Sequence, residues 1–387
     1  MPGVHRNIRL LYLHNFCEDF RPYQVIAILF FAEITGSFAL GMLIHSCVMI
    51  SSAVFELPTG VMSDLMGRKK TMILGSIASF FGLLLFAFAN SLWMLIAGAV
   101  LQGLSRSFFS GNTEALLHDS LREMGREEDY AEVSGRARSM YQLALSISAI
   151  IGAVVAPWSF RWTVWVAVAA QLASVIVSMF FVEPRAHSHE STNVYAHVTE
   201  AFTLFFRNAK IRVLSMGSVI WNGLGETIFY FEPIFIGAIW PVWGIGVART
   251  MDHALGWMSY WYAGRVIRRL GTMNTLLSAL CLSIVLGLLA FIYPTIFSPA
   301  ILVLTAIPYG LIIISQDTLM QQEFSTKQRA TMGSLNSLLG SIFFGICAVL
   351  MGWIADAWSP ITALLLAQIG LIVVLPLYWH ARPRNIE

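Results

Sequence analysis

Twelve apolar stretches, each about 20 residues long, recur along this chain of 387 residues. Only 12% of the residues are charged, against about 25% in an average soluble domain, and 57% are hydrophobic. So small a charged fraction cannot cover the surface of a water-soluble globule of this length. Because about 20 apolar residues are enough to cross a bilayer as a helix, the sequence predicts an all-α membrane protein with twelve transmembrane helices.

The predicted spans have approximate bounds that depend on flanking charges, Gly, Pro and Asn. They are 9–33, 38–62, 71–89, 92–116, 137–157, 161–182, 211–235, 238–263, 273–293, 298–320, 331–354 and 361–380. Lys and Arg gather in the cytoplasmic loops of membrane proteins. With the N-terminus placed in the cytoplasm, 20 of the 24 Lys and Arg residues fall on that side. We therefore expect a multi-pass membrane protein with both termini cytoplasmic.

A polar segment over 183–207 divides the chain near its middle. It is interpreted as a cytoplasmic linker between an N-terminal six-helix bundle, 1–182, and a C-terminal one, 208–387. Its three histidines, His187, His189 and His197, are read as solvated linker residues rather than as a metal site. No metal-ligand spacing is found elsewhere, and no cofactor is expected.

The two predicted halves share an internal repeat. Gly60 and Gly67 follow the second span, and Gly264 and Gly271 follow the eighth with the same spacing, 204 residues later. Duplicated halves with a substrate site at their interface are typical of secondary transporters.

The repeat contains a longer motif in its first copy. Residues 56–70 read ELPTGVMSDLMGRKK and resemble the signature loop of the major facilitator superfamily, G-x-x-x-D-x-x-G-R-K/R-K/R, between helices two and three. The diagnostic positions are held by Gly60, Asp64, Gly67, Arg68 and Lys69. The segments 110–120 and 329–331 also resemble a bacterial, efflux-like branch of that superfamily. The resemblance implies two six-helix bundles related by a pseudo-two-fold axis.

The resemblance also implies a gating role for this motif, hereafter the signature loop (residues 60–70). It places Asp64 and the backbone of Gly60 against the start of helix eleven, near Ala330–Gly333, where unpaired amides and the helix dipole would hold a carboxylate. Arg68 is expected to pair with Asp119 at the inner end of helix four. The hypothesis is a latch that closes the cytoplasmic face. The alternative is a positively charged anchor with a turn glycine.

Ionisable side chains within a membrane are costly, so each one is a functional candidate. On the first span, His14, Glu18 and Arg21 are predicted to share a helical face, with Asn15 and Asp19 on the adjacent one. The resemblance places helices one, four, seven and ten around the cavity, so this polar stripe fits a water-filled path.

The fourth and eighth spans carry the other charged sets. Arg106 and Glu114 are predicted to lie on one side of helix four, with Arg106 as the partner of Glu18 or Asp19. On helix eight, Arg249, Asp252 and His253 share a face, which allows them to pair among themselves, Arg249 with Asp252 above all. That pair is also open to interpretation as a neutralised contact that only specifies packing.

Proton coupling is the expected energy source, with Asp19, Glu18, Glu114 and Glu226 as carriers and Arg106 as counter-ion. No GxxxxGK[ST] loop occurs, which excludes ATP-driven transport by this chain alone. Sodium coupling stays open. The side chains expected to contact substrate are Asn15, Arg21, Trp221, Asn222, Phe229 and Tyr230. An aromatic wall beside a carboxylate suits a cationic amphipathic molecule, although aromatic residues that face lipid are the alternative.

The favoured function is proton-coupled export of small amphipathic molecules by a monomer in the bilayer. The alternative is a proton-coupled importer of a nutrient or metabolite. Gly152 and Pro157 on helix five resemble the antiporter motif of that helix, but the core Gly-Pro and the double Gly of the motif are absent, which leaves the direction of transport open. A membrane enzyme is disfavoured, since neither G-x-S-x-G nor H-E-x-x-H occurs. A net charge of +2 gives no reason to expect a nucleic-acid partner.

Overall fold

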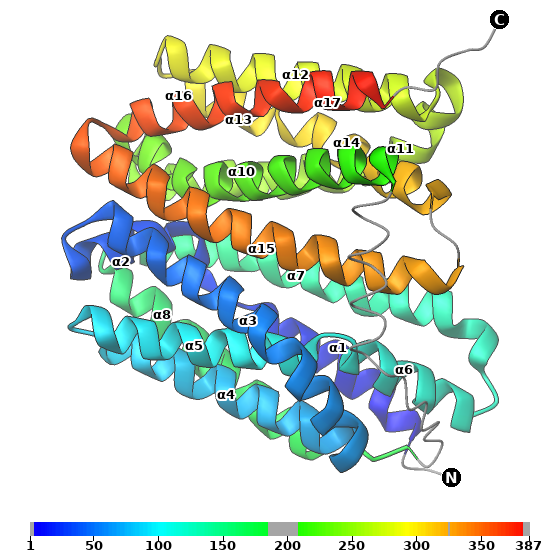
Figure 1. Ribbon diagram of the computed structural model, residues 1–387. Helices are drawn as coiled ribbons and strands as arrows, with labels where there is room; N and C mark the ends of the chain where they lie inside the picture. The colour runs from blue at the N-terminus through cyan, green and yellow to red at the C-terminus, as the bar shows by residue number, and fades with distance from the viewer. Residues whose placement is uncertain (1–3, 185–207, 324–325, 382–387) are drawn as a thin grey trace, which may run out of the picture. The chain divides into compact units, whose positions relative to one another are not determined.

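The computed structural model describes residues 4–184, 208–323 and 326–381, and all regular structure in these ranges is helical (Figure 1). Within them, nine segments are long and apolar enough to cross a membrane. Helices α1, α10 and α11, described below, are not among these nine, and all three carry charged residues inside the expected spans. The prediction of an all-helical membrane protein is confirmed. The chain divides into two compact units, 1–191 and 192–387.

The N-terminal unit contains a helical segment for each of the first six predicted spans. Its elements are α1 (His5–Asp19), the 3-10 turn η1 (Pro22–Ile26), α2 (Ala27–Thr35), α3 (Phe38–Met66), α4 (Arg68–Phe88), α5 (Leu92–Phe109), α6 (Asn112–Glu123), η2 (Glu127–Asp129), α7 (Tyr130–Val155) and α8 (Phe160–Met179). The first and fourth spans are each broken into two helices. Both breaks lie beside charged residues that the sequence singled out.

The C-terminal unit contains the other six spans. Its elements are α10 (Ala209–Ile239), α11 (Val242–Leu270), α12 (Thr272–Ile292), α13 (Ser298–Val303), α14 (Ala306–Glu323), α15 (Thr326–Ala357), α16 (Pro360–Gly370), η3 (Leu371–Val373) and α17 (Val374–His380). The predicted linker 183–207 lies outside the described residues from residue 185 onward, and so do its three histidines.

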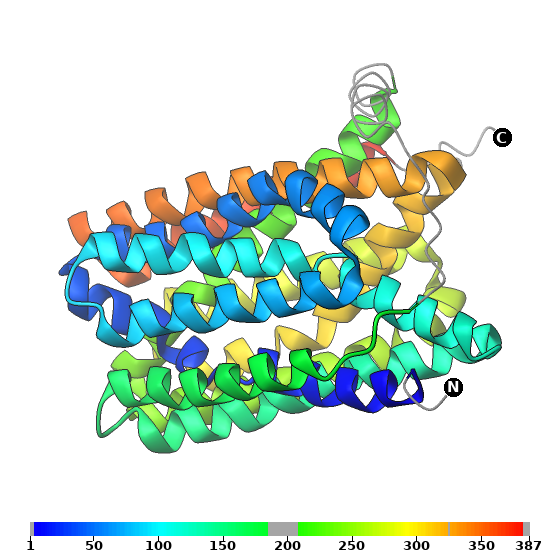
Figure 2. The same ribbon diagram turned by 90° about the horizontal axis from the view of Figure 1, so that it is seen from below.

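Close helix packing in the N-terminal unit depends on a glycine. Helices α3, α4 and α5 run side by side (Figure 2). A Cβ atom built on Gly103 of α5 would lie 2.5 Å from the Ser51 Cβ and 2.6 Å from the Val48 carbonyl oxygen of α3. Small residues let membrane helices approach to backbone contact, and this is such a place.

We expect Gly103→Ala to destabilise the N-terminal unit by about 1–3 kcal/mol, because the added methyl group must push α3 and α5 apart. Gly135→Ala on α7 is the matched control, since a Cβ there meets no described atom within 4 Å. Thermal unfolding of the purified protein in detergent measures both. Equal melting temperatures for the two variants would contradict the close contact.

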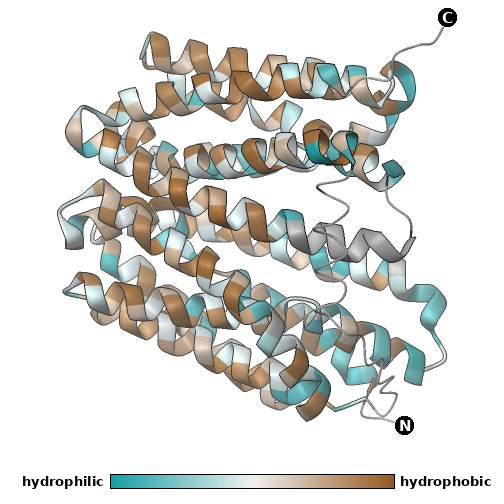
Figure 3. Ribbon diagram, in the orientation of Figure 1, coloured by the Kyte–Doolittle hydropathy of each residue, from teal (hydrophilic) through white to brown (hydrophobic). Residues whose placement is uncertain are grey.

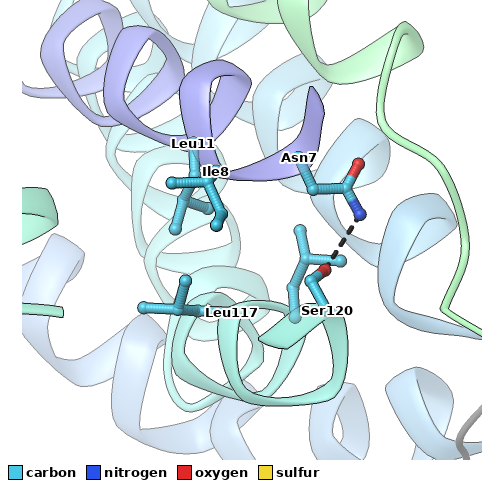
Figure 4. A pocket seen from close by; sticks show the side chains of 6 residues that line it. Asn7, Ile8, Leu11, Leu117 and Ser120 are labelled. Atoms are coloured by element: carbon cyan, nitrogen blue, oxygen red, sulfur yellow. Dashed lines mark hydrogen bonds between the residues drawn. The ribbon is translucent and has the colours of Figure 1, made fainter. Parts of the chain in front are cut away.

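The hydrophilic residues of the N-terminal unit gather at one end of its helices, around α6 and the start of α7 (Figure 3). There the α1–α6 contact is fixed by Asn7 (Figure 4). The Asn7 Nδ2 donates to the Ser120 Oγ at 2.9 Å and to the Val182 carbonyl oxygen at 2.8 Å, and the Asn7 Oδ1 accepts from the Val182 N–H at 2.9 Å. This amide ties α1 to α6 and to the chain that follows α8.

Candidate functional site

The first span breaks where its charged residues lie. Helix α1 ends at Asp19, and Arg21 has φ −129° and ψ 74° before Pro22 opens η1. Proline lacks an N–H and disfavours helical geometry in the residue before it, which explains the break. The predicted common face of His14, Glu18 and Arg21 is therefore wrong, because Arg21 is outside the helix. His14 is buried, with its Nε2 2.9 Å from the Ser76 Oγ of α4.

The break gives Glu18 a full set of partners. Its side chain is buried, and its Oε1 accepts from the Arg21 Nη2 at 2.5 Å and from the Ser79 Oγ at 3.0 Å. The Oε2 accepts from the Ser174 Oγ at 3.3 Å. Arg21 reaches Glu18 from three residues further along the chain, across the break. The carboxylate is thus neutralised and hydrogen-bonded inside one unit, as a buried charge requires.

Two buried glutamines complete this network, and the sequence analysis missed both. The Gln102 Oε1 accepts from the Arg21 Nη1 at 3.1 Å, and the Gln102 Nε2 donates to the Ser79 carbonyl oxygen at 2.7 Å. The Gln171 Nε2 donates to the Glu18 carbonyl oxygen at 2.8 Å. The last carbonyls of a helix lack intrahelical partners, and Gln171 satisfies one of them. The signal available in the sequence was an amide side chain near the middle of a predicted span.

Gly152 on α7 allows the backbone of the broken segment to approach α7 closely. A Cβ atom there would lie 2.5 Å from the Pro22 carbonyl oxygen and 2.7 Å from the Val25 Cγ2. The Arg21 N–H donates to the Ser148 Oγ, one turn earlier on α7, at 2.9 Å. Helix α7 therefore stabilises the broken segment in two ways: the Ser148 hydroxyl accepts a hydrogen bond from it, and Gly152 leaves room for its backbone.

The expected partnership between Glu18 and Arg106 is wrong, because Arg21 holds Glu18. Arg106 is exposed and makes no ion pair in the described part of the chain. It is close enough to act electrostatically on Asp19. Asp19 makes no hydrogen bond or ion pair with any residue that the structure describes, and the Asn15 Nδ2 donates to the Ala137 carbonyl oxygen at 3.5 Å. Of the two adjacent acids, Glu18 has partners for both of its carboxylate oxygens, whereas the Asp19 carboxyl has none among the described residues.

The fourth span also departs from its predicted pattern. Helix α5 ends at Phe109, and α6 begins at Asn112 after Gly111, which has φ +71°. Arg106 and Glu114 therefore do not share one continuous helical face. Glu114 lies in the first turn of α6, where its Oε1 is 3.6 Å from the Arg138 Nη2 of α7, and both side chains are largely exposed.

In the signature loop, α3 ends at Met66 and α4 begins at Arg68, with Gly67 between them at φ +95° and ψ 162°. That region of backbone geometry is accessible almost only to glycine. The carboxylate of Glu183, which follows α8, accepts from the Arg68 N–H at 2.7 Å and from the Lys69 N–H at 2.8 Å. An anion at a helix N-terminus satisfies its free amides and its dipole. The sequence analysis assigned Glu183 only to the linker.

The Arg68 side chain joins three elements. Its Nε lies 3.7 Å from the Asp119 Oδ2 on α6, so the predicted Arg68–Asp119 pair is confirmed. Its Nη1 donates to the Ser63 Oγ at 2.8 Å and to the Asp64 Oδ1 at 3.1 Å. Asn112 binds the same corner, because its Oδ1 accepts from the Ser63 Oγ at 2.7 Å and its Nδ2 donates to the Arg68 carbonyl oxygen at 3.2 Å.

The rest of the predicted latch stays a prediction. Within the described residues, a Cβ on Gly60 would meet no atom within 4 Å. The expected partner of Gly60 and Asp64, near 330–333, lies outside the described side chains.

In the C-terminal unit, the predicted substrate residues lie along α10. Trp221 is buried, and the Asn222 Nδ2 donates to the Ser218 Oγ at 3.1 Å. The Tyr230 ring meets the Phe344 ring of α15 edge-on at 5.8 Å between centroids. Glu226 is half-buried. The Tyr230 ring therefore packs against α15, and Glu226 lies one helical turn before Tyr230 on α10.

The expected pairing of Arg249 with Asp252 is wrong. The Arg249 Nη1 lies 2.9 Å from the Glu232 Oε2 of α10, and its Nη2 donates to the Phe229 carbonyl oxygen. Its guanidinium also lies over the Phe229 ring, 3.8 Å from the centroid. The sequence analysis did not identify Glu232 as this buried partner.

The comparisons with known proteins point to one family. A sequence model of the Major Facilitator Superfamily matches residues 20–343. The tetracycline resistance protein, class B, of Escherichia coli is 22% identical over 355 residues, which cover 87% of this chain and 85% of that protein. An uncharacterized transporter of Buchnera aphidicola is 29% identical over 134 residues, 34% of this chain and only 33% of that protein. The crystal structure of the nucleoside transporter NupG superposes with a TM-score of 0.83, at 14% identity and with both chains fully covered, and this likeness shows the fold.

Proposed function

The chain belongs to the Major Facilitator Superfamily and is a membrane transporter, and from this premise we propose that it exports small amphipathic molecules, cationic ones included, in exchange for protons by alternating access. We also propose that it acts as a monomer in the bacterial inner membrane with both termini in the cytoplasm. The observation that carries the coupling proposal is the pair of adjacent acids at the end of α1.

These two acids have different roles in the proposal. Glu18 is neutralised by Arg21 and holds the break of the first span in place. Asp19 has no partner among the described residues and feels the charge of the exposed Arg106. A free carboxyl group in a poorly solvated place gains or loses a proton as its surroundings change. Asp19 is therefore the proton carrier, and Arg106 tunes its charge, whereas Glu114 is set apart by its exposed pair with Arg138.

The substrate contacts of the C-terminal unit are proposed on α10. Tyr230 supplies aromatic surface, Asn222 supplies an amide, and Glu226 supplies a negative charge, whereas Trp221 is buried in the unit. A cation is attracted both to an aromatic face and to a carboxylate. Arg249 already covers one face of Phe229, so the other aromatic rings are the main contacts in this proposal.

The signature loop is proposed to latch the cytoplasmic face. The Arg68 side chain contacts Ser63, Asp64 and Asp119 near the end of α3. The Glu183 carboxylate accepts a hydrogen bond from the first N–H of α4. Gly60 and Asp64 are both exposed at this corner. In the proposal, the start of the eleventh span docks there when the transporter opens to the outside.

Dye uptake into inverted membrane vesicles tests the proposed direction. An acid interior, made by respiration, should drive accumulation of the fluorescent cation ethidium in vesicles that contain the protein and not in empty ones. Addition of ethidium should also make the interior more alkaline, because protons leave in exchange.

Proton-coupled import is the second candidate, and one observation favours it. Helix α7 ends at Val155, so Pro157 lies beyond the helix and does not kink it. The proline on which the likeness to the antiporter motif partly rests is therefore not inside the helix. Release of preloaded ethidium, rather than uptake, in acid-inside vesicles would support import and contradict export.

A further inference from the structure

A second set of charged side chains lies in the C-terminal unit, on α10 and α11. It consists of Glu232, Arg249, Asp252 and His253, hereafter the α10–α11 cluster. Asp252 is ten residues into α11, which is about 15 Å along a helix and close to the middle of a bilayer about 30 Å thick. Charges at that depth require partners. Nothing in the proposed export mechanism uses this cluster.

The hydrogen bonds divide the cluster unequally. Arg249 is 4% exposed, and Glu232, the Phe229 carbonyl oxygen and the Phe229 ring together occupy its guanidinium. Asp252 lies three residues further on the same helix, where it feels the charge of Arg249 but makes no hydrogen bond or ion pair with any described residue. Two carboxyl groups therefore lie near one arginine, and Arg249 forms its ion pair with Glu232.

Among the described residues of the C-terminal unit, no other charged group is recorded beside Asp252. His253 meets the Phe229 ring at 6.5 Å between centroids and feels only the positive charge of Arg249. On the neighbouring elements, α12 and α13 contain no charged residue. The Ser259 Oγ of α11 donates to the Ile307 carbonyl oxygen, so Asp252, two turns earlier, is level with α13. Asp317 and Glu323 of α14 lie well beyond that level.

The N-terminal unit has the same arrangement. There Glu18 holds Arg21 while Asp19 stays free, and here Glu232 holds Arg249 while Asp252 stays free. In both units one arginine balances one of two acids. The second acid feels the charge of an arginine but makes no ion pair with a described residue. An unpaired carboxylate within a membrane is strongly disfavoured relative to the protonated acid.

We propose that Asp252 is a second proton-binding site of this transporter, located in the C-terminal unit and held in its free state by the Glu232–Arg249 pair. Proton binding makes Asp252 neutral, and proton release leaves an anion that competes with Glu232 for Arg249. Glu232 is thus a positioning residue, because its charge keeps Arg249 away from Asp252.

Infrared difference spectroscopy of the purified protein in lipid tests the proposal without any substrate. A protonated carboxyl group has a C=O stretching band that the carboxylate lacks. The spectrum of wild type minus Asp252→Asn, taken on the acid side of a pH titration, should show this band. Glu232→Gln should remove the same band, because Arg249 is then free to pair with Asp252 and keep it ionised. Glu33→Gln, which changes an exposed acid on α2, is the control and should leave the band in place.

The outcomes separate this proposal from the proposed export mechanism. In an Asp19→Asn background, the Asp252 band should persist, because the two acids lie in different units. If Asp252→Asn leaves the spectrum unchanged, the second site is refuted, whatever Asp19 does. A band that survives Glu232→Gln would refute the positioning role. Loss of the band on addition of NaCl at constant pH would show a sodium site instead of a proton site.

Discussion

Arg21→Ala should be among the most destabilising single substitutions in this protein. It leaves Glu18 buried without its counter-charge, and removal of one partner from a buried ion pair costs about 3–5 kcal/mol. It also frees the Gln102 Oε1 and takes away a donor to the Glu18 carbonyl oxygen. The melting temperature of the purified protein, followed in detergent, should therefore fall strongly.

Arg106→Ala is the matched control for that result. Arg106 is exposed and has no ion pair in the described part of the chain, so its removal should change the stability by no more than about 0.5 kcal/mol. The double variant Glu18→Gln/Arg21→Ala should regain part of the loss, because no uncompensated charge is then buried. If Arg21→Ala melts at the same temperature as Arg106→Ala, the assignment of Arg21 to the Glu18 network is wrong.

Gly67→Ala should have the second-largest effect on stability. The substitution places a side chain at φ +95°, a strain of about 1–3 kcal/mol, and its Cβ would lie 2.7 Å from the Glu183 Oε1. The clash displaces the carboxylate from the start of α4, which adds about 1 kcal/mol for the lost cap. Thermal unfolding measures the sum.

A double-mutant cycle separates the two causes. Glu183→Ala alone should remove the cap, and in its background Gly67→Ala should no longer displace that carboxylate, so the two effects should not add. Gly60→Ala serves as the control within the same loop, since a Cβ there meets no described atom within 4 Å. Strictly additive losses for Gly67→Ala and Glu183→Ala would show that Glu183 does not contact this glycine.

Hydropathy and charge were sufficient to predict the helices of this protein. A membrane span is recognised by its length and apolar content, which are local properties, and each of the twelve predicted spans contains helix. The Arg68–Asp119 pair was also predictable, because the motif fixes Arg68 and the resemblance fixes the level of Asp119.

The partners of the other charged residues were not predictable in the same way. Helical spacing assumes an unbroken helix, and the breaks before Pro22 and at Gly111 rearrange the faces that carry Arg21 and Glu114. Pro22 was a visible warning of the first break. Glu232 and Glu183 bind across the fold to Arg249 and to the start of α4, and no local pattern reveals such contacts.

Proton-driven flux through reconstituted protein tests the central claim most directly. Purified wild type, Asp19→Asn and Glu33→Gln are placed in liposomes, and ethidium movement is followed while a pH gradient is imposed with the membrane potential clamped at zero. We expect the wild type and Glu33→Gln to concentrate ethidium on the acid side, and Asp19→Asn to bind it without concentrating it. Accumulation by Asp19→Asn at the wild-type level, or a wild-type flux that ignores the pH gradient, would contradict the account.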